Sequence, residues 1–258
     1  ETGAAKNRQV AARSEGGTQT GTPPTISGPS RFYLPYQTSS NAAISPAFTT
    51  GWDSTASTIR TPMSTSRGTT AITNVVLTKS VTTNNYDMLF RQYVSDPFLW
   101  DVTVSGTVKG AIRGLTSANA NNAFINQVIK LVNSSGGNER ILFALGTSTA
   151  TNNAWEFTTA AGVRSVPAGN FGTTFNLTSQ TAVAGDRLVI EIGVRHNNAS
   201  SGVTATLAFG DNQATDIPEN TTTSTLNPWI EFSAGLPISG TYAYHQIFIT
   251  DDSLTTSV

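Results

Sequence analysis

The stretch from Asp101 to Arg113 alternates strictly between two kinds of residue, and this alternation constrains the fold more than any other feature of the chain. One face carries Val102, Val104, Gly106, Val108, Gly110 and Ile112, and the other carries Thr103, Ser105, Thr107, Lys109, Ala111 and Arg113. Successive side chains of a β-strand point to opposite faces of a sheet. The stretch therefore predicts one long strand with one face in a core and the other in water, as in an antiparallel sheet.

The same period recurs along the rest of the chain. It is clearest from Leu188 to Val194 and from Val203 to Phe209. Further strands are predicted at Thr73 to Val81, Asp87 to Val94, Phe124 to Val132, Arg140 to Gly146, Phe171 to Leu177, Trp229 to Ser233 and Tyr242 to Thr250. The best helical candidate, Asn119 to Asn133, has its apolar residues out of helical phase, so a strand is predicted there too.

About ten strands in one domain imply two packed sheets. We therefore expect an all-β fold: an antiparallel β-sandwich of the jelly-roll or a related Greek-key type. Four segments are predicted: an extended N-terminal arm (1–30), an extended aromatic and proline-rich strap (31–68), the β-sandwich (69–234) and a C-terminal strand or tail (235–258). The chain begins with Glu1 rather than Met, as expected if an initiating segment was removed or replaced.

The strap combines aromatic residues and prolines without helical spacing. Its large side chains are candidate assembly contacts: Phe32, Tyr33, Leu34, Tyr36, Phe48 and Trp52. Such an extended segment either lies on a neighbouring molecule or packs over its own domain, and both alternatives stay open. The arm has no apolar period and is rich in turn-forming residues, so it should not fold alone. We expect that it becomes ordered only when a partner holds it.

Charge and composition argue against several classes of function. Charged residues make up 12% of the chain, against about a quarter in ordinary globular domains. The 15 basic and 16 acidic residues leave a net charge of −1, so we expect no nucleic-acid partner. No long apolar run suggests a membrane span. With no Cys, the chain has no disulfide, thiolate metal site or cysteine nucleophile.

The loop from Gly210 to Glu219 is the best metal candidate. Asp211, Asp216 and Glu219 place several oxygen ligands in one turn-rich stretch, and Ca²⁺ prefers oxygen ligands. The EF-hand spacing is missing, and Asp and Asn also end strands by binding their own backbone. Bound Ca²⁺ and ordinary turn formation are therefore both open, and no other cofactor is expected.

Other site candidates are weaker. Trp155, after a polar loop, and Asn198 are candidate glycan contacts, because exposed aromatic rings stack on sugars. Glu191 and Glu231 lie in predicted strands and could form the carboxylate pair of a glycoside hydrolase, although pairing with Arg or Lys on a solvated sheet face is the simpler interpretation. His196 follows a strand and is interpreted as a loop residue at a sheet edge.

Several phrases of the chain together resemble uncharacterised structural proteins of tailed-bacteriophage virions. They are Arg31-Phe32-Tyr33-Leu34-Pro35, Ile44-Ser45-Pro46-Ala47-Phe48, Gly51-Trp52, Tyr86-Asp87, Arg91 through Pro97, Gly106 through Gly110, Ala184 through Gly193, Phe209-Gly210-Asp211 and Pro228 through Phe232. The resemblance covers about residues 31 to 233. It implies a head decoration, collar or tail component, located in the extracellular virion, and no reaction.

We therefore expect a non-enzymatic virion subunit that decorates the capsid or associates with the tail or collar. Its partners would be other virion proteins, such as major capsid or tail proteins, and further copies of itself in a symmetric homo-oligomer such as a trimer. Val75 to Leu77, or Ile247 to Ile249, could complete a neighbour's sheet edge, although pairing within their own sheet is the simpler interpretation. The alternatives are a carbohydrate-binding adhesin or fibre module and a subunit of a cellular surface filament.

Overall fold

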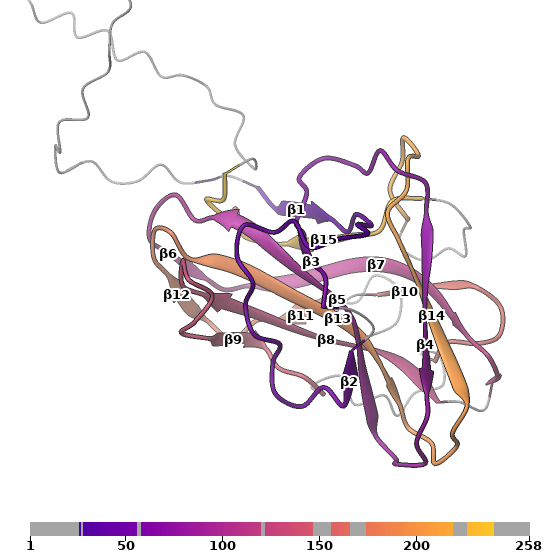
Figure 1. Cartoon of the computed structure of the whole chain (residues 1–258). Helices are drawn as coiled ribbons and strands as arrows, with labels where there is room; N and C mark the ends of the chain where they lie inside the picture. The colour runs from indigo at the N-terminus through magenta and orange to yellow at the C-terminus, as the bar shows by residue number, and fades with distance from the viewer. Residues whose placement is uncertain are drawn as a thin grey trace, which may run out of the picture.

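A computed structural model describes residues 26, 28–55, 58–119, 122–146, 156–165, 174–218 and 226–239. The elements of regular structure whose bounds lie within the described residues are all β-strands (Figure 1). The strands are β1 Ser30–Tyr33, β2 Ser54–Thr55, β3 Arg60–Pro62, β4 Thr73–Lys79, β5 Tyr86–Pro97, β6 Val102–Val104, β7 Thr107–Thr116, β8 Ala123–Val132, β9 Arg140–Phe143, β10 Gly162–Ser165, β11 Phe175–Asn176, β12 Gln180–Ala182, β13 Arg187–His196, β14 Val203–Phe209 and β15 Trp229–Phe232. The predicted arm up to residue 25 and the predicted strand from Tyr242 to Thr250 lie outside these residues.

The first large sheet, sheet A, is built around β7. Ala111 of β7 pairs with both Trp229 of β15 and Ser165 of β10, and Gly114 pairs with both Leu207 of β14 and Gly162 of β10. A strand residue has one neighbour on each edge, so β14 and β15 share one edge of β7 while β10 occupies the other. The short strand β11 continues that second edge. Strand β4 lies beyond β14, and β1 lies beyond β15.

The second large sheet, sheet B, has the order β5-β13-β8-β9. Strand β13 is its centre, with antiparallel neighbours on both sides. Eight strands of the two large sheets follow one another along the chain: β4, β5, β7, β8, β9, β10 with β11 taken together, β13 and β14. In this order they lie in sheets A, B, A, B, B, A, B and A. The two resulting four-stranded sheets have the orders β4-β14-β7-β10/β11 and β5-β13-β8-β9. Together they form an eight-stranded jelly roll. The predicted fold class is confirmed.

The core lies between the inner faces of these sheets. Residues from alternate positions of the central strands fill it, including Ile190 and Ile192 of β13 and Leu207 of β14. Two smaller apolar clusters lie on the outer faces. Val189 belongs to the one on sheet B, and Trp229 belongs to the one on sheet A. Both outer faces are therefore partly covered by other segments of the chain.

The stretch from Asp101 to Arg113 is not one strand, which corrects the prediction. It contains β6, which pairs with β12 in a separate small sheet, and most of β7 in sheet A. The break falls at Gly106, whose φ of 86° is a left-handed conformation that suits glycine. Glycine occupied an apolar position in the alternation, so the pattern continued through a point where the backbone turns.

The first part of the strap packs on its own sandwich, which is one of the two alternatives that the sequence left open, so its candidate assembly contacts are core residues instead. Phe32, Tyr33 and Leu34 are buried within the chain. Strand β1 pairs with β15 in sheet A, whereas β2 and β3 pair in parallel with β5 in sheet B. Figure 1 shows the strap, in indigo, passing across sheet B between these contacts.

The remaining predicted assembly contacts are half-buried and contact their own domain. Arg60 stacks over the Phe48 ring with its Cζ 4.2 Å from the centroid, and Arg91 lies over Tyr36 at 5.0 Å. Trp52 lies against Gly193 of β13, where an added Cβ would come within 2.5 Å of the indole. A glycine in a central strand thus lets the strap approach the sheet closely.

A buried ion pair fixes the strap to sheet B. Lys130 of β8 and Glu191 of β13 are fully buried, and their Nζ and Oε1 atoms are 3.0 Å apart. Lys130 Nζ also donates to Ala47 O at 2.9 Å and to Thr49 Oγ1 at 2.8 Å. Glu191 Oε2 accepts from Trp52 Nε1 at 2.7 Å. We call Lys130, Glu191 and these strap partners the strap lock.

Further hydrogen bonds complete the strap lock. Gln92 Nε2 donates to Glu191 Oε1 at 2.9 Å, and Thr49 N donates to the same carboxylate at 3.1 Å. Glu139, at the rim of the sheet, accepts a hydrogen bond from Lys130 Nζ at 2.7 Å. Both buried charges are therefore surrounded by hydrogen-bond partners, as burial of charge requires.

Removing one charge of the strap lock should destabilise the protein strongly. We expect Lys130→Met to lower the free energy of unfolding by about 3–5 kcal/mol, because it leaves the Glu191 carboxylate buried without its counter-ion. The double variant Lys130→Met/Glu191→Gln should lose less free energy of unfolding, since Gln is neutral and still accepts a hydrogen bond from Trp52. Urea denaturation of the three proteins measures this.

A matched control is Lys109→Met, because Lys109 forms a longer, partly exposed pair with Glu231 at 3.8 Å. That change should lower the free energy of unfolding by no more than about 1 kcal/mol. Equal losses for the Lys130 and Lys109 variants would contradict the assigned role of the strap lock.

Candidate functional site

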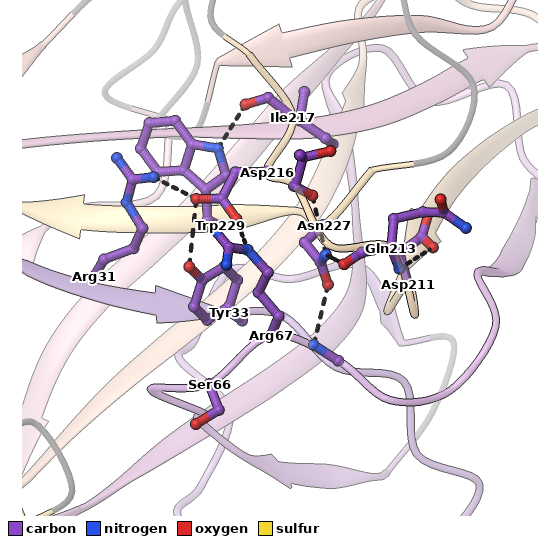
Figure 2. Close-up of polar contacts among 12 residues, drawn as sticks. Arg31, Tyr33, Ser66, Arg67, Asp211, Gln213, Asp216, Ile217, Asn227 and Trp229 are labelled. Atoms are coloured by element: carbon purple, nitrogen blue, oxygen red, sulfur yellow. Dashed lines mark hydrogen bonds and ion pairs between the residues drawn. The ribbon is translucent and has the colours of Figure 1, made fainter.

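A cluster of opposite charges on the outer face of sheet A is the most organised polar surface among the described residues. It joins Arg31 of β1, Arg67 of the strap, Asp216 of the loop before β15, and Glu231 of β15. We call these four residues the arginine cluster. Figure 2 shows Arg31 and Arg67 reaching the Asp216 carboxylate from separate segments of the chain.

Asp216 is the centre of the arginine cluster. Its Oδ2 accepts from Arg31 at 2.6 Å and from the Tyr33 hydroxyl at 3.3 Å, and its Oδ1 accepts from Arg67 Nε at 2.6 Å. Short contacts between arginine and carboxylate are among the stronger protein hydrogen bonds. Asp216 therefore ties β1 and the strap to the loop that leads into β15.

Trp229 forms the floor of the arginine cluster. It is buried, and its Nε1 donates to Ile217 O at 2.7 Å. The Arg31 guanidinium carbon lies 3.9 Å from the ring centroid, while Arg31 Nε donates to Glu231 Oε2 at 2.8 Å. The period of β15 explains this arrangement, because Trp229 and Glu231 point to the same face of the sheet.

Burial and charge both alter the ionisation of this surface. Burial lowers the pKa of Arg31, but its hydrogen bonds and charge interactions with Asp216 and Glu231 outweigh burial and raise the pKa overall. Burial raises the pKa of Tyr33, and the negative charge of Asp216 raises it further. The cluster therefore consists of permanently charged arginines beside a neutral tyrosine at physiological pH. Its chemistry suits recognition and cross-linking of segments.

Two of the three predicted metal residues, Asp211 and Asp216, lie within the described structure. Asp211 Oδ1 accepts from the Gln213 amide at 3.0 Å, which is a turn within the loop, and Asp216 is bound by two arginines. Glu219 lies outside the described residues. Within the part that the structure describes, no three His, Asp or Glu side chains are placed to hold a metal. A Ca²⁺ site at this loop stays a prediction.

Asn227 organises the same loop through its amide. Its Nδ2 donates to Gln213 O at 2.6 Å and to Thr215 O at 3.0 Å, and its Oδ1 accepts from Gly68 N at 3.0 Å (Figure 2). This buried residue was missed by sequence reasoning. An Asn before a strand is so common that it carries no signal about partners far away in the sequence.

Of the two predicted glycan contacts, only Asn198 lies within the described structure. Asn198 is partly buried, and both its backbone and side-chain oxygens accept from Lys79 Nζ. Trp155 lies outside the described residues. His196 corrects the interpretation as a loop residue, because it is the buried last residue of β13 and pairs with Ala123 and Tyr86 on either side.

The two candidate hydrolase carboxylates are far apart in the fold. Glu191 lies in the strap lock on the outer face of sheet B, whereas Glu231 lies in the arginine cluster on the outer face of sheet A. A shared cleft for these two residues is therefore excluded. The expected pairing with Lys or Arg is found at both, although Glu191 is fully buried and its expected solvation is wrong.

A cleft of about 380 Å³ borders the arginine cluster at Arg67. Its lining is Pro35, Gln37, Pro62, Met63, Ser64, Ser66, Arg67, Gly68, Thr69 and Thr70. The strap supplies almost all of this lining, so the strap lock and the arginine cluster together position it. Hydroxyl, amide and guanidinium groups beside the apolar Pro35, Pro62 and Met63 suit a polar ligand with several hydrogen-bonding groups.

Comparisons with known proteins give little guidance. No family model and no curated protein matches the sequence. A crystal structure of a CocE/NonD family hydrolase from Staphylococcus aureus is similar at 11% identity and a TM-score of 0.25, covering 83% of this chain and 36% of that one. A second structure of that hydrolase has 10% identity and a TM-score of 0.23, covering 69% of this chain and 33% of its own length.

This chain thus spans about a third of the length of the hydrolase structures. A likeness at these scores supports no conclusion about activity. Among the described residues, no helix is long and apolar enough to cross a membrane.

The Tyr33 hydroxyl offers a direct test of the arginine cluster. Its raised pKa means that its contribution to stability is present below the ordinary tyrosine value and is lost as pH rises through the folded pKa. We expect Asp216→Asn to bring the pKa of Tyr33 down, because the negative charge beside the hydroxyl is removed. Ultraviolet titration of tyrosinate, with Tyr33→Phe to assign the signal, measures this. An unchanged titration in Asp216→Asn would contradict the described geometry.

Proposed function

We propose that this chain is a structural subunit of a bacteriophage virion, which decorates the capsid or associates with the tail or collar. In this role it assembles with further copies of itself and with other virion proteins. It provides a rigid block and contact surfaces, and it carries out no reaction. The resemblance of its strap and strand sequences to tailed-phage virion proteins is the first support.

The observation that carries the proposal is the use of charge within the fold. Lys130–Glu191, Arg31–Asp216 and Arg140–Asp186 each join segments far apart in the sequence, as does Arg195–Asp87 at 2.6 Å. In each pair the carboxylate is held by a cation and fixes a strand or loop on the jelly roll. Such use of charge favours a rigid building block, and jelly rolls are common among viral capsid domains.

The chain should be present in purified virions at a fixed copy number. Particles banded on a density gradient are expected to contain it in a constant ratio to the major capsid protein, because symmetric assembly fixes the number of sites. Quantitative mass spectrometry of successive gradient fractions measures the ratio. Recovery of the chain only in the soluble fraction of the lysate would overturn the proposal.

The cleft at Arg67 favours a second candidate function, that of a carbohydrate-binding module for host-surface recognition. Jelly rolls also occur among lectins, and a sugar has the hydroxyl groups that the cleft's Gln37, Ser66 and Thr70 side chains could bind. Its site would then be the cleft at the strap, instead of the predicted Trp155 and Asn198.

A glycan array probed with the purified chain tests this second function. Gln37→Ala should weaken any binding by about fivefold, because it removes one hydrogen bond worth on the order of 1 kcal/mol. Thr103→Ala on the exposed face of β6 is the matched control and should leave binding unchanged. Binding that ignores the Gln37 change, or an array without any signal, would remove this candidate.

A further inference from the structure

Strand β4 leaves one edge of sheet A open. It pairs with β14 on one side, over the whole length from Thr73 to Lys79. Within the described residues, no strand pairs with its other side. Figure 1 shows β4 beside β14 at the end of the sheet. An open edge presents unpaired backbone groups to whatever approaches it.

The directions of the backbone groups follow from the β14 ladder. Ser117 N donates to Thr204 O, so Thr204 directs its backbone groups away from β4 and toward the β7 side. Because the direction alternates along an antiparallel strand, Ala205 and Leu207 direct theirs to β4. Their register partners on β4, Leu77 and Val75, are therefore satisfied within the sheet.

The intervening residues of β4 are consequently left with outward-directed backbone groups. They are Asn74, Val76 and Thr78, each with one N–H and one C=O. Their side chains lie on the exposed face, and Val76 is 56% exposed. The open edge thus combines six unpaired backbone groups with an exposed apolar residue at its midpoint.

This edge has none of the usual protection against pairing. Natural edge strands carry prolines, outward lysines or bulges. Strand β4 has no proline, and its pairing with β14 is regular throughout. Its one charged residue, Lys79, is fully buried and donates to Asn198. An uncharged, regular edge of this length is suited to pairing with another strand.

We propose that β4 pairs antiparallel with β4 of a second copy, around a two-fold axis that passes midway between the two Val76 residues. This inference rests on the proposed function for the setting in which copies meet. It joins sheet A of both copies into one continuous sheet. The interface is isologous, because the same strand contributes on both sides.

The sequence of β4 is complementary to itself in this register. Val76 faces Val76 of the second copy, and Asn74 faces Thr78 on the same, solvent-exposed side. On the inner side Val75 faces Leu77. The outward backbone groups of Asn74, Val76 and Thr78 then exchange hydrogen bonds with those of Thr78, Val76 and Asn74, so all six on each chain are satisfied. Lys79 faces Thr73, so no like charges oppose each other.

A shift of the register by one residue would break this match. It would place the outward backbone groups of one strand against the inward-bonded groups of the other, and it would exchange the exposed and inner faces. The self-complementary register therefore favours a second copy as the occupant of this edge over an unrelated segment.

The absence of Cys from the chain makes disulfide trapping a clean test. Val76→Cys should form a cross-linked dimer under mild oxidation, because directly opposed residues have Cα atoms about 5.5 Å apart. Thr78→Cys should not cross-link to itself. A mixture of Asn74→Cys and Thr78→Cys proteins should cross-link to each other. Val183→Cys, exposed elsewhere, reports random collision.

A charge at the two-fold axis provides the complementary test. Val76→Lys should weaken dimerisation by at least about tenfold, because two lysines then face each other. Its unfolding transition should match that of the unmodified protein, since Val76 is exposed. Dimerisation is measured by analytical ultracentrifugation over a range of concentrations, and Val183→Lys is the matched control.

Cross-linking at the level of Val183→Cys for every β4 variant would overturn the inference. So would slow hydrogen exchange at Asn74, Val76 and Thr78 in dilute monomer, because another segment of the same chain would then cover the edge. Either result leaves the proposed virion role intact if the chain still bands with particles. Conversely, trapped dimers of a chain that never enters virions would support the pairing and refute the virion role.

Discussion

The ion pair between Lys130 and Glu191 is the interaction on which the outer layer of the molecule depends. Two full charges are buried between sheet B and the strap, and each is tolerable only because strap atoms complete its hydrogen bonds. Ala47, Thr49 and Trp52 supply those atoms. Without the strap the pair would be open to water, and without the pair the strap would cover a polar sheet face with little to hold it there.

The arginine cluster has the corresponding role on the opposite sheet. Arg31 and Arg67 bring β1 and the strap onto the loop before β15, and Trp229 is enclosed beneath them. Burial and charge act together here, because the covered ring and the paired guanidinium each limit the access of water to the other. Both outer faces of the jelly roll are thus partly covered by the chain's own segments. Contact with other molecules is left to edges, rims and the cleft.

The sequence predicted the parts of this fold that depend on periodicity. Strands β13 and β14 were located because apolar residues alternate with polar or small ones, which leaves a direct record in the order of residues. Gly106 was missed as a break because a glycine fits an apolar position in the pattern and also permits a turn. The strap was left undecided for a related reason, since Phe32 and Leu34 must be covered by something, and sequence cannot name the surface that covers them.

The polar sites show the same limit more strongly. Lys130 stands in the apolar run of β8, and that anomaly could have signalled a buried charge; its partner Glu191 is identified by the packing of β13 beside β8. Arg31 and Asp216 are 185 positions apart, so no local pattern connects them. Edge strands are an intermediate case. The residues of β4 specify its two faces, but only the sheet order shows that one edge is open. Since both outer faces of the sandwich are partly covered, that edge is where the backbone itself is available for assembly.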